Sequence, residues 1–134
     1  MRWIDIDLSA GRAEWKTVDE KLREQFIGGS GLGAFIAYRE KLWEHDPLSP
    51  GNMLIFAAGP FTGTKIPCSG RHALVSRSPL TGMFAESDVG GRWGVALVKC
   101  GIHLVTVRGV SERPVYAEIS PTGCRLRSAD GIWG

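Results

Sequence analysis

The sequence predicts an α+β fold in which strands outnumber helices, with two or three helices beside mixed β-sheets. The first observation behind this is that short apolar runs, bounded by turn residues, recur along all 134 residues, whereas helical spacing is confined to a few segments. The second is that glycine supplies 18 of the residues, about twice its usual share of roughly 7%. So many glycines beside strong apolar runs indicate tight turns, left-handed backbone, or close approach of backbone to a ligand.

The chain begins with a predicted hairpin. Residues 3–8 alternate apolar and acidic side chains, residues 9–12 form a turn, and residues 13–18 return as the second strand. Asp19 is placed to cap a short helix that runs through Phe26.

A second helix is expected after the glycine-rich residues 28–34. Several apolar side chains behind these glycines fall on one helical face, namely Leu32, Phe35, Ile36, Leu42 and Trp43. Pro47 and Pro50 are predicted to end this helix, because the residue before a proline is disfavoured in the helical conformation.

The remaining elements are mostly strands. They are expected at residues 53–58, 72–77, 83–85, 103–108, 114–119 and 124–128. One more helix is expected from the helical spacing of Trp93, Ala96, Leu97 and Cys100. Asp88 is expected to cap its first turn and Gly101 to follow its last.

Composition excludes several classes of protein. The net charge is +2 without a basic stripe, so no nucleic-acid surface is indicated. No apolar run reaches 18 residues, so no membrane helix is expected. Acidic residues stand where a signal peptide is apolar, and the chain is therefore expected to be cytoplasmic.

The side chains most often used for metal binding do not form a recognisable pattern. Cys68, Cys100 and Cys124 are an odd and scattered set without the spacing of a disulfide framework or a metal site. The three histidines likewise lack metal-ligand spacing, and no nucleophile motif or phosphate-binding P-loop is present. No catalytic residue is predicted.

One glycine motif has two interpretations. Gly29, Gly31 and Ala34 match the G-x-G-x-x-A fingerprint of dinucleotide-binding proteins, but the motif follows a predicted helix where the fingerprint requires a strand. We favour a glycine turn that joins two helices and lets them pack closely, with a ligand-facing backbone as the second interpretation. Dinucleotide binding stays as an alternative, which the absence of NAD(P) binding by calorimetry would exclude.

Two other segments favour an anion or cofactor site. The paired glycines Gly90 and Gly91 expose backbone N–H groups between Asp88 and Arg92, which suits phosphate. Arg71 follows Ser69 and Gly70, and a guanidinium leaving such a turn can bind a phosphate or a heteroaromatic edge. The alternatives are a capped tight turn at the first segment and a solvated surface arginine at the second.

The last residues, 129–134, start a new segment that ends with Trp133 and Gly134. Either Trp133 packs back onto the body of the domain, or the chain is a piece of a longer protein.

Taken together, these motifs resemble the start of the aldehyde ferredoxin oxidoreductases. The resemblance runs in order along essentially the whole chain: GGSGLGA at 28–34, PLSPGN at 47–52, IFAAGPFTGT at 55–64, PCSGR at 67–71, SRSPLTG at 76–82, SDVGG at 87–91 and IWG at 132–134. It implies that residues 1–134 are one domain, an incomplete form of this family's N-terminal domain, in a cloned fragment, a truncated gene product or a subunit of a split enzyme.

The resemblance also implies a function. The family comprises tungsten or molybdenum enzymes that oxidise aldehydes to carboxylic acids and pass the electrons through a [4Fe–4S] cluster to ferredoxin. Their N-terminal domain is a base for two molybdopterin-type groups whose phosphates a magnesium ion bridges. By resemblance, Arg71 would contact the pterin, and the backbone at Asp88, Gly90 and Gly91 would hold the cofactor.

Two departures from the family pattern matter. Asp88 stands where the family usually has Asn, and a carboxylate beside phosphate is repulsive unless magnesium offsets it. The cluster-binding cysteines and later domains are absent from these 134 residues, so no activity is expected of the chain alone. The alternative is a non-catalytic assembly module or split-enzyme subunit that pairs with itself or with another chain.

Overall fold

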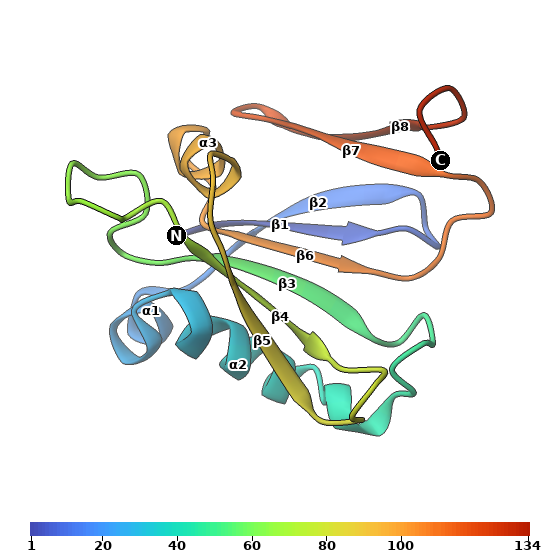
Figure 1. Cartoon of the computed structure of the whole chain (residues 1–134), viewed down its shortest axis with the longest axis horizontal. Coiled ribbons are helices and arrows are strands. Elements are labelled where there is room, and N and C mark those ends of the chain that lie inside the picture. Colours follow the sequence, from blue (N-terminus) through green and yellow to red (C-terminus); the bar gives the residue numbers. More distant parts are fainter.

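The computed structural model describes residues 1–134 and confirms the predicted α+β class (Figure 1). Six strands form a mixed sheet in the order β2-β1-β6-β3-β4-β5, in which only β1 and β6 are parallel, and β7 and β8 form a separate hairpin. The elements are β1 (Arg2–Asp7), β2 (Arg12–Thr17), α1 (Glu20–Phe26), α2 (Gly29–Arg39), a 3-10 helix (Leu42–Glu44), β3 (Met53–Ala58), β4 (His72–Arg77), β5 (Phe84–Val89), α3 (Trp93–Lys99), β6 (Leu104–Arg108), β7 (Val115–Ser120) and β8 (Gly123–Ser128).

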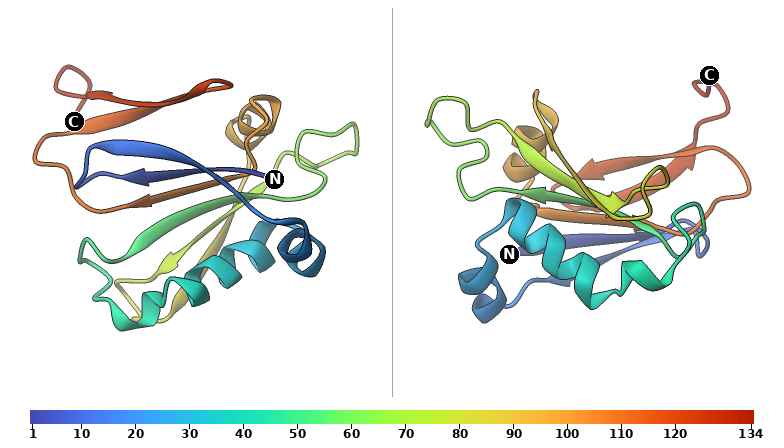
Figure 2. Two further views of the ribbon diagram at one scale, coloured as in Figure 1. Left: turned by 180° about the vertical axis from the view of Figure 1, so that it is seen from behind. Right: turned by 60° about the horizontal axis from the view of Figure 1, so that its bottom comes forward.

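The sheet is covered on both faces. Helices α1 and α2 lie on one face, while α3 and the β7–β8 hairpin lie on the other (Figures 1 and 2). The alternation along β1 divides the core accordingly. Trp3 packs with residues of α1 and α2 such as Leu22 and Ile36, whereas Ile4 and Ile6 pack with Leu97 of α3.

A buried polar network crosses the centre of the sheet. The Thr106 hydroxyl donates to the Asp5 carboxylate at 2.6 Å, and the Trp3 indole N–H donates to Thr106 at 2.8 Å. Lys16 from β2 and Arg108 from β6 both form ion pairs with Asp5. The carboxylate is therefore fully partnered although Asp5 is only 5% exposed.

The junction between α1 and α2 shows why glycine is needed there. Asp19 caps α1 as predicted, its carboxylate accepting from the backbone N–H of Leu22 at 2.7 Å. A Cβ at Gly28 would lie 2.7 Å from the Ala58 carbonyl oxygen, and one at Gly33 would lie 2.8 Å from Val75 Cγ2. The close packing expected of this segment is confirmed, but the turn between the two helices is limited to Ile27 and Gly28, because Gly29, Gly31 and Gly33 lie within α2. Because the motif follows α1 and no strand, the dinucleotide-binding arrangement is wrong.

Both predicted bounds of the second helix are wrong. Helix α2 begins at Gly29, inside the glycine-rich residues 28–34 rather than after them. Helix α2 ends at Arg39, well before either proline, because Lys41 adopts a left-handed backbone with φ 53°. The 3-10 turn that follows carries Leu42, which is buried, and Trp43, which is half-exposed.

The predicted cap of the last helix is also wrong. Asp88 lies inside β5, opposite Ala73 of β4, so the strand is longer than the expected residues 83–85. Helix α3 begins after Arg92, whose side chain makes no capping hydrogen bond. Strand pairing with β4 explains the difference, because it keeps the backbone extended through Val89 and leaves Arg92, rather than Asp88, as the residue directly before α3.

The predicted apolar face of α3 is only partly buried. Leu97 lies in the core, but Trp93 remains 43% exposed at its first turn. Trp133 is 72% exposed, so the interpretation that it packs back onto the domain is wrong. None of the helices combines the length and apolar content required to cross a membrane.

Candidate functional site

Strands β4 and β5 bring the two predicted charged residues together. Arg71 immediately precedes β4, and Asp88 lies near the end of β5, so the antiparallel pairing puts both at the same end of the sheet. Arg71 Nη1 and Asp88 Oδ2 are 3.8 Å apart, and each side chain is more than half exposed. This is a solvated pair, and the guanidinium keeps donors free for another partner.

The glycines beside this pair leave the backbone open. A Cβ at Gly90 or Gly91 would meet no atom within 4 Å, and Gly91 has a left-handed φ of +87°. Gly70 lies close to the same segment, since a Cβ there would be 3.3 Å from the Gly91 carbonyl oxygen. Four predicted residues (Arg71, Asp88, Gly90 and Gly91) thus lie in one exposed region with room for a ligand against bare backbone.

A loop hydrogen bond fixes the backbone at Arg71. The buried Thr62 hydroxyl donates to the Arg71 carbonyl at 2.7 Å and accepts from the Gly59 N–H at 2.9 Å. The same loop lines a shallow cavity of about 270 Å³ that includes Arg71. Thr62 was not predicted from the sequence; the only signal was its place among the prolines and glycines before Arg71.

A second residue that the sequence did not reveal lies beneath the site. His72 is 3% exposed and packs beside Phe56 and Trp93, with its ring centroid 4.9 Å from that of Trp93. A Cβ at Gly94 would lie 2.8 Å from Nδ1, which has no hydrogen-bond partner. Burial lowers the pKa of the imidazole below its usual value, so the ring is neutral near pH 7. His72 is therefore a packing residue that supports the first turn of α3.

The N-terminus of α3 contributes less to an anion site than the sequence predicts. Helix α3 has seven residues and begins two positions beyond Gly91. An anion at this site would depend on Arg71 and on the open backbone at Gly90 and Gly91 rather than on a helix terminus.

No metal centre is formed by the side chains of this chain. Nowhere do three or more His, Cys, Asp or Glu side chains gather closely enough to hold an ion. Cys68 is exposed, and Cys100 and Cys124 are partly buried; all three are free thiols. Burial raises the pKa of the Cys124 thiol, which makes it less reactive.

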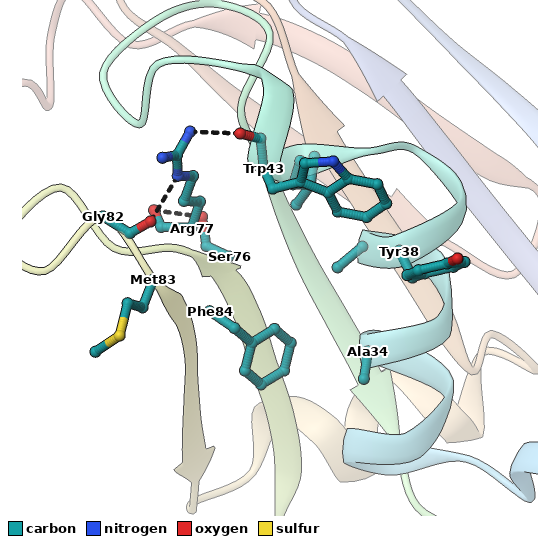
Figure 3. Close-up of a pocket in the computed structure, with 10 residues that line it drawn as sticks. Ala34, Tyr38, Trp43, Ser76, Arg77, Gly82, Met83 and Phe84 are labelled. Carbon is teal, nitrogen blue, oxygen red and sulfur yellow. Dashed lines mark hydrogen bonds between the residues drawn. The ribbon is translucent and has the colours of Figure 1, made fainter.

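A largely apolar cavity is separate from these residues. It has a volume of about 450 Å³ and lies between α2 and the start of β5. Figure 3 shows Tyr38 and Trp43 on one side and Met83 and Phe84 on the other. Arg77 closes one end, donating to the carbonyl oxygens of Gly82 and Trp43. Phe84 and Asp88 lie toward opposite ends of β5, so this cavity is distinct from the Arg71 region.

Comparison with known proteins identifies the domain. Residues 3–134 match the family model described as aldehyde ferredoxin oxidoreductase, N-terminal domain. The chain is 40% identical to a tungsten-containing aldehyde ferredoxin oxidoreductase of Pyrococcus furiosus, over 99% of the chain and 22% of that enzyme. It is 31% identical to the WOR-like subunit of an aliphatic sulfonate oxidoreductase of the same organism, over 98% of the chain and 21% of that subunit.

A solved structure has the same fold. It is the active site complex BamBC of benzoyl coenzyme A reductase in complex with 1,5-dienoyl-CoA. The TM-score is 0.95 and the identity 33%, over 99% of the chain and 20% of the matched chain. The chain thus spans about a fifth of the length of the proteins it matches. It therefore belongs to the aldehyde ferredoxin oxidoreductase family and corresponds to the N-terminal domain of these tungsten oxidoreductases.

Proposed function

We propose that this chain forms part of the base for a tungsten (or molybdenum) bis-pterin cofactor in an oxidoreductase. The enzyme would oxidise aldehydes to carboxylic acids with ferredoxin as the electron acceptor. The observation that carries the proposal is the open backbone at Gly90 and Gly91 beside the exposed guanidinium of Arg71. The family membership and the tungsten-containing relatives support it.

Each residue of the site has a proposed role. Arg71 donates hydrogen bonds to a phosphate or to a polar pterin edge, because its planar guanidinium suits bidentate acceptors. The Thr62 hydroxyl donates a hydrogen bond to the Arg71 carbonyl and so fixes the backbone from which the guanidinium extends. The backbone at Asp88, Gly90 and Gly91 contacts the cofactor phosphates.

A bridging magnesium ion fits the charge of this site. The Asp88 carboxylate would repel phosphate, and a divalent cation between them removes that repulsion. When bound, the metal-pterin group supplies the redox chemistry, and the protein supplies binding and orientation.

The remaining components belong outside this chain. The three cysteines are far apart in sequence, and no cluster of ligands is formed, so a [4Fe–4S] cluster would be held by other parts of the enzyme. We propose that electron transfer to ferredoxin occurs through those parts and that the chain has no activity alone.

We propose that the substrate is also selected by parts of the enzyme outside this chain. Relatives from P. furiosus that match all or part of this chain are named for different substrates: aldehydes and aliphatic sulfonates over nearly the whole chain, and glyceraldehyde-3-phosphate over 64% of it. One N-terminal domain serving such different molecules would bind what they share, which is the cofactor.

The test is the cofactor content of a complete enzyme that carries this chain. Arg71→Ala should lower both bound tungsten by elemental analysis and pterin by fluorescence after oxidation. Arg12→Ala is the matched control, because Arg12 is an equally exposed arginine on the far strand β2, paired with Glu14. Full tungsten and pterin content in Arg71→Ala would remove the proposed role.

The apolar cavity of Figure 3 favours a second candidate, an assembly module that pairs with itself or with another chain. Tyr38, Met83 and Phe84 are each more than half exposed there, and exposed apolar patches of this kind mark interaction sites. Light scattering of the purified chain tests it. A folded monomer at all concentrations would exclude self-pairing, and a Phe84→Ser variant should weaken any dimer that forms.

A further inference from the structure

A second cavity lies at the same end of the sheet, on the side of helix α1. It has a volume of about 410 Å³ and is bounded by α1, the end of β3, helix α3 and the start of β6. Its walls include Met1, Arg23, Ile27, Pro60, Val98 and His103. Arg71 and Asp88 are not among the residues that line it.

The charged groups of this cavity are all basic. The positive charges are those of the Arg23 guanidinium and the Met1 amino group, the imidazole of His103 lines the cavity as a neutral ring, and no acidic residue lines it. The nearest carboxylate partner of Arg23 is Glu20, at 3.9 Å, and both side chains are more than half exposed, so this pair neutralises little. The cavity is therefore an electropositive pocket without an anion of its own.

His103 faces these charges directly. Burial lowers the pKa of its imidazole, and the positive charges of Met1 and Arg23 lower it further, against a small opposing effect of the Gly101 carbonyl. Nδ1 of this ring is buried and has no hydrogen-bond partner. Because Nδ1 has no accessible surface, a ligand in the cavity would meet the other atoms of the ring, and the charge of a bound anion would favour the protonated imidazole.

The other walls are apolar. Ile27, Pro60 and Val98 offer carbon surface opposite the basic groups. The volume falls within the range of about 300–1,000 Å³ that is typical of small-molecule pockets, so the cavity has room for more than an inorganic anion. A phosphate group with a short organic substituent fits both kinds of wall.

We propose that this cavity binds a phosphate monoester, with the phosphate against Arg23 and His103 and the organic group against Ile27, Pro60 and Val98. The basic residues of this site differ from that of the cofactor site proposed above, since Arg23 and His103 do not line the cavity beside Arg71, although Gly59, Pro60 and Thr62 line both cavities.

The experiment is an NMR titration of the 134-residue chain that follows the ring signals of His103. Glycerol 3-phosphate should shift these signals saturably and raise the pKa of His103. Arg23→Gln should weaken the apparent affinity about tenfold, consistent with the loss of one charge-assisted contact. Because the Arg23 side chain is exposed, this variant should keep the fold, and dispersed amide signals verify that it does.

Controls distinguish the alternatives. Arg12→Gln and Arg71→Ala should leave the affinity unchanged, and loss of binding in Arg71→Ala would reassign the phosphate to the cofactor region and overturn this proposal. Inorganic phosphate should bind more weakly than the ester; binding of equal strength would overturn the role of the apolar wall. No saturable shift of His103 with glycerol 3-phosphate up to tens of millimolar would overturn the site itself.

Discussion

The Arg71 guanidinium and the Asp88 carboxylate face each other at 3.8 Å across β4 and β5, at the end of the sheet where the backbone of Gly90 is open. The pair is exposed, so its attraction is screened by solvent. The weak ion pair keeps the Arg71 guanidinium beside the open backbone, where it can donate hydrogen bonds to an anionic ligand.

Replacing Asp88 by Asn is expected to leave the fold intact and the arginine more available. The free energy of unfolding should change by less than about 1 kcal/mol, because exposed ion pairs contribute little. In a complete enzyme, tungsten and pterin content should stay equal, since in the proposed site it is the backbone at this position, and not the side chain, that contacts the phosphates. Urea unfolding and elemental analysis measure the two effects. Cofactor loss as large as that of Arg71→Ala would mean that the carboxylate itself is required.

Gly90→Ala should separate cofactor binding from folding. A Cβ at Gly90 would have no atom of the protein within 4 Å. The free energy of unfolding should therefore fall little or rise by up to about 1 kcal/mol. Cofactor content should nevertheless fall, because the methyl group occupies space that the proposed ligand needs. Gly131→Ala is the control, since it is equally open and lies outside the site. Equal cofactor content in both variants would contradict the assignment of Gly90.

Gly33→Ala is expected to destabilise the domain through a clash with Val75. The added methyl group would lie 2.8 Å from Val75 Cγ2 in the closed interface between α2 and the sheet. Overpacking costs about 1–3 kcal/mol, and the better helix propensity of Ala returns up to about 1 kcal/mol of that. Thermal and urea unfolding measure the net loss.

A double-mutant cycle checks the cause of this loss. Val75→Ala leaves a small cavity, and the methyl group of Gly33→Ala should partly fill it, so the double variant should be more stable than the sum of the single changes predicts. Strict additivity would exclude a direct clash between the two positions.

The buried Asp5 predicts a loss of stability in acid. Burial by itself raises the pKa of the carboxyl group, but hydrogen bonds from Lys16 and Thr106 and the charges of Lys16 and Arg108 outweigh it and lower the pKa. Because the folded-state pKa lies below the unfolded value of about 3.9, this contribution is complete above that pH and is lost as the pH falls through the folded-state pKa.

Asp5→Asn tests this dependence. The variant should lose about 2–4 kcal/mol of stability at pH 7, because it leaves buried partners without their anion. The difference in the free energy of unfolding between the variant and the parent protein should shrink below pH 4, as measured by urea unfolding at several pH values. Glu14→Gln, which removes an exposed carboxylate on β2, serves as the control and should change stability by less than about 1 kcal/mol. A difference that is constant from pH 7 to pH 3 would contradict the assignment.

Local patterns in the sequence determined most elements of this protein. The strands at Met53–Ala58 and His72–Arg77 and the cap at Asp19 depend on neighbouring residues, so apolar periodicity and capping chemistry were sufficient to predict them. The family was evident for a similar reason, since its motifs are short and contiguous.

Tertiary structure decided what depends on distant partners. Asp88 became a strand residue because β4 was there to pair with it, and the helix end at Arg39 depended on one left-handed residue that no periodicity reveals. Thr62, His72 and the basic cavity around Arg23 and His103 arise from residues brought together by the sheet order. Contacts between segments far apart in the chain set the chemistry of these sites, and a single sequence carries no record of which segments meet.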